Sequence, residues 1–407
     1  MAFDVLIVGT GHAGAHAAIS LRQQCFGGTI ALLGEETGLP YERPPLSKAY
    51  LAGRKAPERL LIRTSAFWSE RGIALLPGRR VVAVEPDRHV VRAADGERIQ
   101  YGKLIWAGGG RARKLGCAGS GLAGVCTLRS LADADRMRTG LQEAERVVII
   151  GAGFIGLEVA ATLKALGKKV TVVESEARVL SRAVGVPLAK FLEQEHRARG
   201  VDLRLGSHVA HMEGIDGHVS RVVLESGERL PADMVVVGVG LIPEADALLD
   251  AGAAGGDGVD VDERCQTSLP DIHAVGDCAS QVSPFRHGAR ARIESVQNAV
   301  EQASTAASAV LGKATGRHAV PWFWSEQYDL RVQMAGLSRD YDDCIVRGAP
   351  TSGSFSVLYV RDQRLIAADC VNAPRDFAQA RALILNGARV RGGGALSDST
   401  IPLTALG

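Results

Sequence analysis

The sequence lacks an apolar run long enough to span a bilayer, although 46% of its 407 residues are hydrophobic. Its first four residues lead directly into an apolar stretch, without the features of a signal peptide. The chain also lacks a large net charge of either sign, because its formal charge is only +2. This balance gives no global reason to expect binding to nucleic acid or to a membrane. We therefore expect a globular cytoplasmic protein with neither of these partners.

Cysteine pairs with metal-binding spacing are absent as well. The seven cysteines are scattered, odd in number and never arranged as C-x-x-C. This usage fits a reducing compartment and argues against a zinc or iron–sulfur site within the chain. We expect no metal site and interpret most of these cysteines as small buried hydrophobic residues.

A nucleotide-binding pattern is present at the start of the chain. Four consecutive apolar residues, Val5–Val8, predict a strand buried on both faces. Gly9, Gly11 and Gly14 follow at once in the spacing G-x-G-x-x-G. A helical run comes next, and then a second apolar stretch that ends at Glu35. In such a unit the glycines permit a tight turn and the approach of a pyrophosphate, and the acid accepts hydrogen bonds from a ribose. The stretch predicts a dinucleotide site.

The same pattern recurs in the middle of the chain. The apolar run Val147–Ile150 is followed by Gly151, Gly153 and Gly156, then by a helical stretch and a strand ending in Glu174. Two complete fingerprints are far more specific than one, because strand, glycines, helix and acid all recur in register. The repeat predicts two nucleotide-binding domains, in a chain long enough for two or three domains.

The acid of the second unit also bears on the choice of coenzyme. A carboxylate at Glu174 accepts from a 2′-hydroxyl and repels a 2′-phosphate, which favours NADH over NADPH. Arg178 lies close enough in sequence to keep NADPH open as an alternative.

Other segments of the first half carry candidate site residues. The loop Gly38–Lys48 is stiffened by two prolines and carries cations close to the first fingerprint. The stretch Gly78–Tyr101 predicts short antiparallel strands, and the strand Leu104–Trp106 ends at Ala107 and three glycines, where backbone can lie against a ligand. A helix is predicted over Leu131–Glu145.

The second half contains three further signals. A buried strand brings Gly276 and Asp277 to its carboxyl end, where ligands bind in open α/β sheets. A helix is predicted to begin at Arg292 and continue to Leu311. From about Ala319 the chain predicts a small α+β domain, in which Trp324 is either core or a cover for a flavin edge.

On these motifs the chain resembles the FAD-dependent, NADH-using ferredoxin reductases that serve bacterial cytochrome P450 and aromatic oxygenase systems. The resemblance covers nearly the whole chain, and its most specific segments are Arg43–Lys48, Ala274–Cys278, Arg292–Val296 and Pro321–Ser325. It implies an α/β flavoprotein of glutathione-reductase-like architecture, with two Rossmann-like domains and a small α+β C-terminal domain. The implied boundaries are 1–108 with 241–318 for the FAD domain, 109–240 for the NAD domain and 319–407 for the C-terminal domain.

The resemblance also implies which positions contact the cofactors. Those assigned to FAD are Gly9, Gly11, Ala13, Gly14, Glu35, Arg43, Lys48, Val81, Ala107, Arg129, Asp277, Val296 and Trp324. Those assigned to NADH are Gly151, Gly153, Phe154, Ile155, Gly156, Glu158, Glu174 and Gly240. Lys48 and Glu158 are the candidate catalytic residues. Glu158 is expected to place the nicotinamide, and Lys48, with the helix that begins near Ser295, to favour the reduced and more negative flavin.

Two positions depart from the family pattern. Gly108 stands where a threonine is usual, and Glu244 stands where an asparagine is expected. Both changes are expected to alter affinity or flavin potential without changing the assignment.

The implied activity passes electrons from NADH through FAD to a [2Fe-2S] ferredoxin. Such ferredoxins are usually acidic, so arginines near the flavin edge are expected to steer docking, with Arg290 and Arg292 as candidates. The protein is expected to be a monomer or a weak homodimer.

Two alternatives remain at this point. A disulfide or peroxide reductase of the same architecture needs a reactive cysteine in the loop after the first fingerprint, and the segment Gly34–Lys48 has none. A redox signalling flavoprotein similar to apoptosis-inducing factor is the second alternative.

Overall fold

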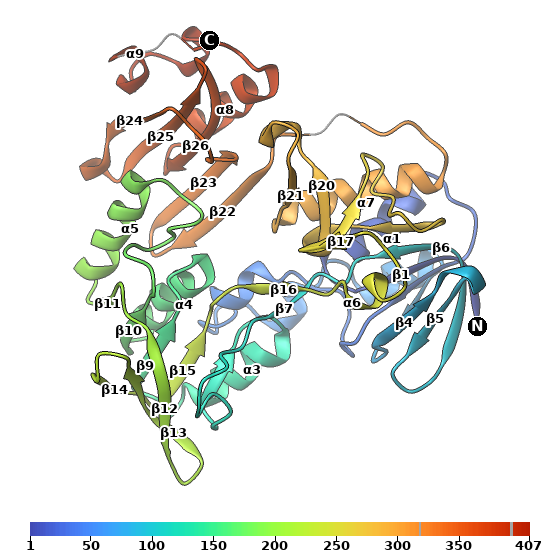
Figure 1. Ribbon diagram of the computed structural model, residues 1–407, viewed down its shortest axis with the longest axis horizontal. Coiled ribbons are helices and arrows are strands. Elements are labelled where there is room, and N and C mark those ends of the chain that lie inside the picture. The colour runs from blue at the N-terminus through green and yellow to red at the C-terminus, as the bar shows by residue number, and fades with distance from the viewer. Residues whose placement is uncertain (317–318, 391–393) are drawn as a thin grey trace. The chain divides into compact units, whose positions relative to one another are not determined.

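The computed structural model describes residues 1–316, 319–390 and 394–407. The chain forms two compact units (Figure 1). The first unit comprises Met1–Glu42, Pro57–Arg111 and Ile242–Trp322. The second unit comprises Arg43–Ala56, Ala112–Leu241 and Phe323–Gly407. The division into FAD, NAD and C-terminal domains stays a prediction.

The first unit is built on a sheet in the order β3-β2-β1-β6-β5-β4, with β19 added beside β6. The strands are β1 (Ala2–Val8), β2 (Ile30–Leu33), β3 (Ile73–Leu76), β4 (Val81–Glu85), β5 (Val90–Ala93), β6 (Arg98–Trp106) and β19 (Ile272–Ala274). Strands β1, β2, β3, β6 and β19 run parallel, whereas β5 pairs antiparallel with both β4 and β6. The predicted antiparallel strands are therefore confirmed.

Alanine-rich helices cover this sheet. Helices α1 (His12–Gln23) and α7 (Val296–Val310) pack against each other, and their alanines share one core with β1. Because alanine side chains are small, the two helices approach each other closely. The remaining elements of the unit are α2 (Ser65–Glu70), α6 (Asp246–Leu249) and a small sheet of β17 (Gly255–Gly256), β18 (Gly258–Val261), β20 (Ala279–Val282) and β21 (Arg290–Arg292).

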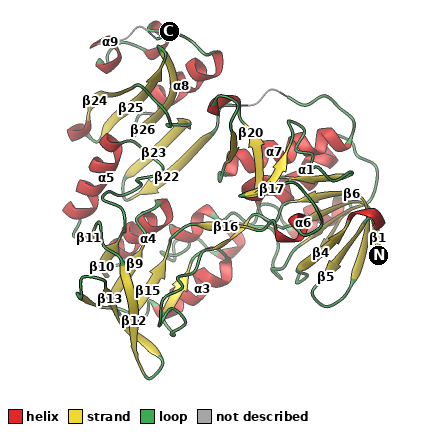
Figure 2. Ribbon diagram, in the orientation of Figure 1, coloured by secondary structure: helices red, strands yellow, loops and turns green. Residues whose placement is uncertain are grey.

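The second unit contains a parallel sheet in the order β11-β10-β9-β15-β8 (Figure 2). The strands are β8 (Val125–Thr127), β9 (Arg146–Ile150), β10 (Lys169–Val173), β11 (Asp202–Arg204) and β15 (Met234–Val237). Its helices are α3 (Leu131–Gly140), α4 (Phe154–Ala165) and α5 (Val186–Ala198). An antiparallel sheet of β12 (Val209–Ile215), β13 (His218–Leu224) and β14 (Arg229–Pro231) follows.

The last part of the second unit is an antiparallel sheet in the order β22-β23-β26-β25-β24. Its elements are β22 (Trp322–Gln327), β23 (Leu330–Gly336), β24 (Asp343–Ala349), β25 (Ser354–Arg361), β26 (Arg364–Val371), α8 (Pro374–Asn386) and α9 (Gly394–Ser397). This part shares one hydrophobic core with the parallel sheet, and the rings of Phe191 and Phe355 meet at 4.9 Å. Short strands β7 (Gly110–Ala112) and β16 (Leu241–Pro243) lie where the chain passes between units.

A buried cation anchors the end of this part. The Arg347 guanidinium is 1% exposed and forms an ion pair with Asp376 at 2.9 Å. It also donates to the carbonyl oxygens of Leu396, Asp398 and Ile401. These three acceptors come from the last stretch of the chain, which the Arg347 side chain therefore helps to hold in place.

Two predicted helix boundaries are wrong. The helix expected over Leu131–Glu145 ends at Gly140, because the backbone N–H groups of Glu145 and Arg146 bond to Asp233 and turn the chain into β9. The helix expected from Arg292 begins at Val296, because the Ser295 side chain accepts from the N–H of Asn298 and caps the helix there. Arg292 belongs to β21 instead.

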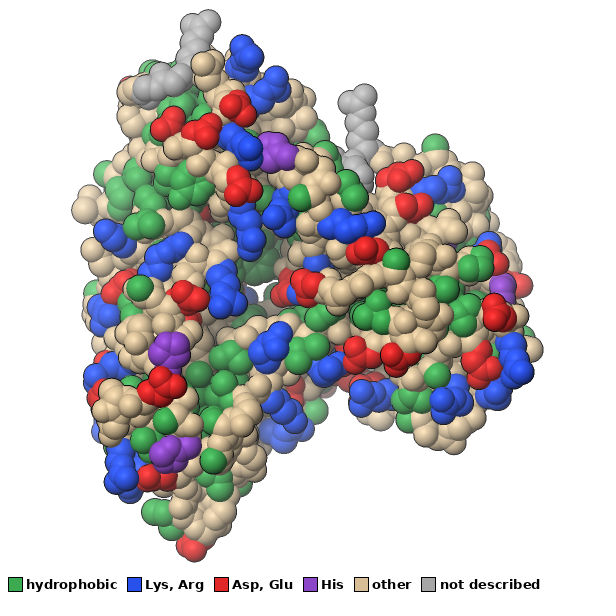
Figure 3. Space-filling view, viewed as in Figure 1, with side chains coloured by type: hydrophobic (Ala, Val, Ile, Leu, Met, Phe, Trp, Pro, Cys, Tyr) green, Lys and Arg blue, Asp and Glu red, His purple; other side chains and the backbone are tan. Residues whose placement is uncertain are grey.

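The surface is of mixed charge. On the face shown in Figure 3, basic and acidic side chains are interspersed, as the formal charge of +2 predicts. Within the described part of the chain, none of the helices combines the length and apolar character that a membrane crossing requires.

Candidate functional site

The first glycine-rich loop joins β1 to α1 in a conformation that requires glycine. Gly9 has a φ of +112°, and a Cβ there would lie 2.1 Å from the carbonyl oxygen of Ala107. A Cβ on Gly14 would lie 1.8 Å from the carbonyl oxygen of Gly9. Gly11 is the N-cap of α1, so the first N–H groups of this helix have no intrahelical partner. This arrangement fits a pyrophosphate at the helix N-terminus.

The second loop, between β9 and α4, repeats this geometry. Gly151 has a φ of +102°, and a Cβ there would lie 2.4 Å from the carbonyl oxygen of Gly238. A Cβ on Gly156 would lie 2.0 Å from the carbonyl oxygen of Gly151. Both helices that follow the loops have 12 residues. The predicted internal repeat is thus confirmed in the backbone itself.

The middle glycine of the second loop is different. Gly153 is the N-cap of α4 with an ordinary φ of −75°, and a Cβ there would meet no atom within 4 Å. The polypeptide therefore gives no steric reason for glycine at this position. Open space directly before a helix N-terminus is what a pyrophosphate needs to approach the backbone. The second loop accordingly fits a dinucleotide as well as the first.

In the first unit, predicted flavin contacts gather where the parallel strands end. The glycine loop follows β1, Ala107 follows β6, and Asp277 lies in a short 3₁₀ turn, η4 (Gly276–Cys278), just after β19. A Cβ on Gly276 would lie 3.0 Å from the Cβ of Ala13, so this turn lies against α1. Parallel strands place their carboxyl ends at one edge, which is the ligand edge of such sheets.

The other predicted flavin contacts of this unit lie on or after β2, β4 and α7. Glu35 follows β2 and is exposed, 3.9 Å from Arg80. Val81 is the first residue of β4, and Val296 is the first residue of α7. The capped N-terminus of α7 thus starts at the residue that the resemblance assigns to FAD.

In the second unit, Glu174 lies beside the glycine loop. Its carboxylate accepts from the backbone N–H of Ala152 at 2.7 Å and from that of Glu176 at 2.9 Å. Arg178 instead donates to the carbonyl oxygens of Ser181 and Val184. Arg178, whose guanidinium was the reason to keep NADPH as an alternative coenzyme, is therefore bound to the backbone of its own loop. Gly240, with a φ of +107°, follows β15 at the same edge.

Besides Gly156, helix α4 carries three predicted NADH contacts. Ile155 is exposed, so its side chain is accessible to a ligand. The ring of Phe154 lies 4.8 Å from that of Phe323. Glu158 is only 2% exposed. The contact of Phe323 with Phe154 was missed from the sequence, because nothing in the pattern pairs β22 with α4.

Glu158 is the centre of a buried polar cluster. One carboxylate oxygen, Oε2, accepts from Ser47 Oγ at 2.6 Å and lies 2.7 Å from Lys48 Nζ. The other oxygen, Oε1, accepts from Ser325 Oγ at 2.7 Å. Thr162, one turn later on α4, donates to the carbonyl oxygen of Ser47 at 2.8 Å. The structure therefore brings together the two candidate catalytic residues and adds two serines that the sequence reasoning missed.

Four predicted flavin contacts belong to the second unit, namely Arg43, Lys48, Arg129 and Trp324. Arg43 precedes η1 (Pro44–Ser47) and donates to the carbonyl oxygen of Arg129 at 2.7 Å. Trp324 on β22 is half-buried, 6.4 Å from the ring of Phe323. Their contacts with FAD, like those of Lys48, stay predictions.

The arginines suggested for docking are already paired. Arg290 lies 3.3 Å from Asp260, and Arg292 lies 2.5 Å from Glu294 and 3.1 Å from Asp257. Because acids neutralise both guanidinium groups, they offer little free positive charge to a partner.

The two departures from the family pattern lie against each other. A Cβ on Gly108 would lie 2.9 Å from the carbonyl oxygen of Glu244 and 2.8 Å from Trp106 Nε1, which donates to the same oxygen. The Glu244 side chain pairs with Arg111 at 3.0 Å. The absence of a side chain at Gly108 thus lets the segment around Glu244 approach the end of β6.

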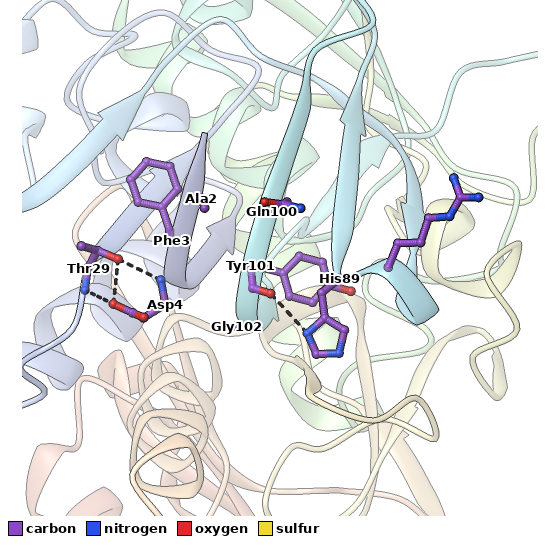
Figure 4. Close-up of a pocket in the computed structure, with 9 residues that line it drawn as sticks. Ala2, Phe3, Asp4, Thr29, His89, Gln100, Tyr101 and Gly102 are labelled. Atoms are coloured by element: carbon purple, nitrogen blue, oxygen red, sulfur yellow. Dashed lines mark hydrogen bonds between the residues drawn. The ribbon is translucent and has the colours of Figure 1, made fainter.

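A separate hollow of about 350 Å³ lies in the first unit (Figure 4). It is lined by Ala2, Phe3, Asp4, Thr29, Arg88, His89, Gln100, Tyr101 and Gly102. The Asp4 carboxylate accepts from both Thr29 groups, and the His89 ring stacks on Tyr101 at 5.2 Å. The hollow lies at the amino ends of β1 and β6, opposite to the glycine loop, and is therefore not the dinucleotide site.

The second unit also contains a buried acid–phenol pair. Tyr359 donates to Asp369 at 2.5 Å and accepts from the backbone N–H of Gly185 at 2.9 Å. Burial raises the pKa of Asp369 to about 7, an effect that the hydrogen bond from Tyr359 only partly offsets.

This pair predicts a pH-dependent stability. Between about pH 4 and 7 the folded chain keeps a proton on Asp369 that the unfolded chain releases. The stabilisation is complete below the unfolded pKa and is lost as the pH rises through about 7. We expect Asp369→Asn to abolish this dependence, so that its Tm relative to the wild type rises by several degrees between pH 5 and 8. Thermal unfolding measures this, with the exposed Asp362→Asn as control. Parallel Tm profiles for wild type and Asp369→Asn would contradict the assignment.

Comparisons with known proteins agree with this geometry over the whole chain. Residues 3–303 match the family described as pyridine nucleotide-disulphide oxidoreductase, and residues 322–407 match the reductase C-terminal family. The 5,5′-dehydrodivanillate O-demethylase ferredoxin reductase subunit of a Sphingobium species is 51% identical over 405 residues, which cover 99% of this chain and 98% of the relative. Putidaredoxin reductase CamA of Pseudomonas putida is 43% identical, over 99% of this chain and 96% of its own.

Solved structures give the same result. The reductase in the covalent putidaredoxin reductase–putidaredoxin complex superposes with a TM-score of 0.95 at 42% identity, covering 99% of this chain and 97% of that one. The ferredoxin reductase for the CYP199A2 system of Rhodopseudomonas palustris gives 0.94 at 37% identity, covering 99% of both chains. With two glycine loops of matching geometry and relatives aligned along their full length, the chain belongs to the pyridine nucleotide-disulphide oxidoreductase family, among its flavoprotein ferredoxin reductases.

Proposed function

We propose that this protein passes electrons from NADH through bound FAD to a [2Fe-2S] ferredoxin that feeds a cytochrome P450 or aromatic-ring oxygenase. The observation that carries the proposal is the presence of two glycine-rich dinucleotide-binding loops in one chain, here called the two cradles. The relatives align over nearly their full length and are named ferredoxin reductases. Two cradles suit a reaction in which one dinucleotide reduces another. FAD, when bound, supplies the chemistry, because it accepts a hydride and can return electrons one at a time.

Within this function the first cradle is assigned to FAD and the second to NADH. The Glu174 carboxylate, held by two backbone N–H groups, favours a ribose with a free 2′-hydroxyl. The engagement of Arg178 with Ser181 and Val184 supports the same choice, because this guanidinium is not directed at a 2′-phosphate. We therefore expect NADH to be preferred over NADPH.

The roles of the chain's own residues follow from their positions. The N-termini of α1 and α4 hold the two pyrophosphates, and Asp277 accepts from sugar-alcohol hydroxyls. Glu158, fixed by Lys48 and two serines, orients the nicotinamide. Lys48 contributes positive charge that favours the reduced flavin.

The partner and the location are inferred together. A soluble electron carrier of acidic character suits a reductase of this family, and putidaredoxin is the partner of the solved relative. We place the protein in the cytoplasm, where NADH is made and where seven unpaired cysteines persist.

A cysteine-dependent reduction is disfavoured on chemical grounds. Cys278 is next in sequence to the predicted flavin contact Asp277, but burial raises the pKa of its thiol to about 11. A thiol with such a pKa is not a thiolate at neutral pH and does not act as a nucleophile.

The test is direct. The purified protein should be yellow, bleach when NADH is added without air, and reduce cytochrome c at least tenfold faster once a [2Fe-2S] ferredoxin is present. NADPH should serve at least tenfold less well than NADH by kcat/KM. A rate indifferent to every ferredoxin favours the signalling alternative, and two new thiols on reduction favour a disulfide reductase. A colourless protein that cannot take up FAD overturns the proposal.

A further inference from the structure

A series of buried polar side chains, joined by hydrogen bonds, extends from Glu158 to β22 and α5. We call it the Glu158 series. Ser325 Oγ, which donates to Glu158, accepts from Gln327 Nε2 at 3.1 Å. Gln327 Oε1 lies 2.9 Å from His196 Nε2 on α5, and His196 Nδ1 lies 3.0 Å from the hydroxyl of Tyr328. Ser325 and Gln327 are fully buried, and His196 is 1% exposed.

The Glu158 carboxylate fixes the direction of every hydrogen bond in the Glu158 series. A carboxylate paired with a lysine only accepts, so Ser325 donates to Glu158 and must accept from the amide N–H of Gln327. The amide oxygen of Gln327 then faces His196, whose Nε2 must carry the proton. Burial lowers the pKa of His196, so the ring is neutral at pH 7 and its Nδ1 accepts from Tyr328. All four donors therefore point toward Glu158.

Tyr328, at the end of the Glu158 series farthest from Glu158, lies in a strained turn. Tyr328 has a φ of +58°, which is unfavourable for a side chain of this size. The Arg199 guanidinium lies 4.4 Å over its ring and 2.7 Å from Asp329, the next residue. A conformation of this kind persists only where surrounding contacts impose it, and such positions cluster at functional sites.

We propose that Ser325, Gln327 and His196 are positioning residues for hydride transfer, because they fix the orientation of the Glu158 carboxylate. This inference rests on the proposed function, in which Glu158 orients the nicotinamide. Lys48 and Ser47 both contact Oε2, and within the described part of the chain Ser325 supplies the hydrogen bond that orients Oε1. The C-terminal sheet thus contributes to the reaction through Ser325 and Gln327 on β22, and none of the three positioning residues needs to touch NADH.

Hydrogen bonds aligned in one direction polarise and strengthen one another, so a change in one of them alters the strength of the next. His196 therefore affects Glu158 through Gln327 and Ser325, two side chains away. Replacing His196 with leucine removes the donor that polarises the Gln327 amide. Replacing it with glutamine keeps an N–H donor of similar reach.

The experiment is anaerobic stopped-flow reduction of the FAD-loaded protein by NADH. We expect Ser325→Ala to lower the limiting rate of flavin reduction about tenfold, since small misplacements of an orienting group cost this much. The Kd for NADH and the FAD content should change less than twofold. His196→Leu should lower the rate about fivefold, and His196→Gln should restore most of it.

The matched control is Ser356→Ala. Ser356 is also a fully buried serine of the same sheet, and it donates to the carboxylate of Asp376. It does not belong to the Glu158 series. It should reduce flavin at the wild-type rate. Equal rates for Ser325→Ala and wild type, or equal losses in the two serine variants, would overturn the inference. Because His196 is two links away, its leucine and glutamine variants decide the matter even where Ser325→Ala fails to fold. Failure of the wild type itself to be reduced would instead overturn the proposed function.

Discussion

Gly153→Ala should leave the protein folded and yellow while weakening NADH binding at least tenfold. The backbone at this position has an ordinary conformation, and a Cβ there meets no protein atom within 4 Å. The added methyl group would instead occupy the space through which the pyrophosphate approaches the N-terminus of α4. Loss of one or two hydrogen bonds to a charged group costs about 1.5–3 kcal/mol each, which is a tenfold or greater loss of affinity.

The measurement separates ligand binding from folding. Tm, FAD content and reduction of the flavin by dithionite should match the wild type, and only the Kd for NADH should rise. Gly156→Ala provides the contrast, because its Cβ would lie 2.0 Å from a carbonyl oxygen and should destabilise the second unit itself. An unchanged Kd for Gly153→Ala would show that the second loop does not bind the coenzyme.

Lys48→Met should be the most destabilising single change at the site. Glu158 is 2% exposed, and removing its lysine leaves a buried carboxylate with only two hydroxyl donors. Breaking one side of a buried ion pair costs about 3–5 kcal/mol. Urea unfolding should show this loss, and NADH should reduce the flavin more slowly in the protein that remains folded.

The double variant Lys48→Met, Glu158→Gln tests the cause. With both charges removed, most of the lost stability should return, because replacing a complete buried pair is often neutral. Flavin reduction should stay slow, because the orienting carboxylate is gone. Lys169→Met, an exposed lysine at the start of β10, should change stability by less than about 0.5 kcal/mol. A double variant as unstable as the single one would contradict the ion-pair explanation.

The parts of the fold that the sequence predicts well are those where local chemistry decides the conformation. Gly9 and Gly151 both adopt the left-handed backbone that the repeated spacing predicts, because any Cβ would collide with a carbonyl oxygen. The helix boundaries at Gly140 and Val296 were less predictable. They are decided by side chains such as Asp233, which is far away in sequence, and by a serine cap that the apolar pattern does not reveal.

The polar cluster around Glu158 depends on contacts between segments that are far apart in the sequence. Lys48 and Glu158 were predicted separately as catalytic residues, yet their ion pair joins segments 110 residues apart. Ser325 and His196 carry no local signal at all, since an isolated serine or histidine in a strand or helix is usually structural. Only the packing of η1, α4, α5 and β22 within the second unit brings these side chains together.

The buried Arg347 has a consequence for synthesis of the chain. Three of its acceptors lie at Leu396, Asp398 and Ile401, so during translation this guanidinium has only Asp376 until those residues leave the ribosome. The C-terminal sheet therefore cannot reach its final packing before those residues are available. Deleting residues from Leu396 onward should leave the buried guanidinium paired with Asp376 but without its three carbonyl acceptors, and chaperones and proteases would recognise such a state.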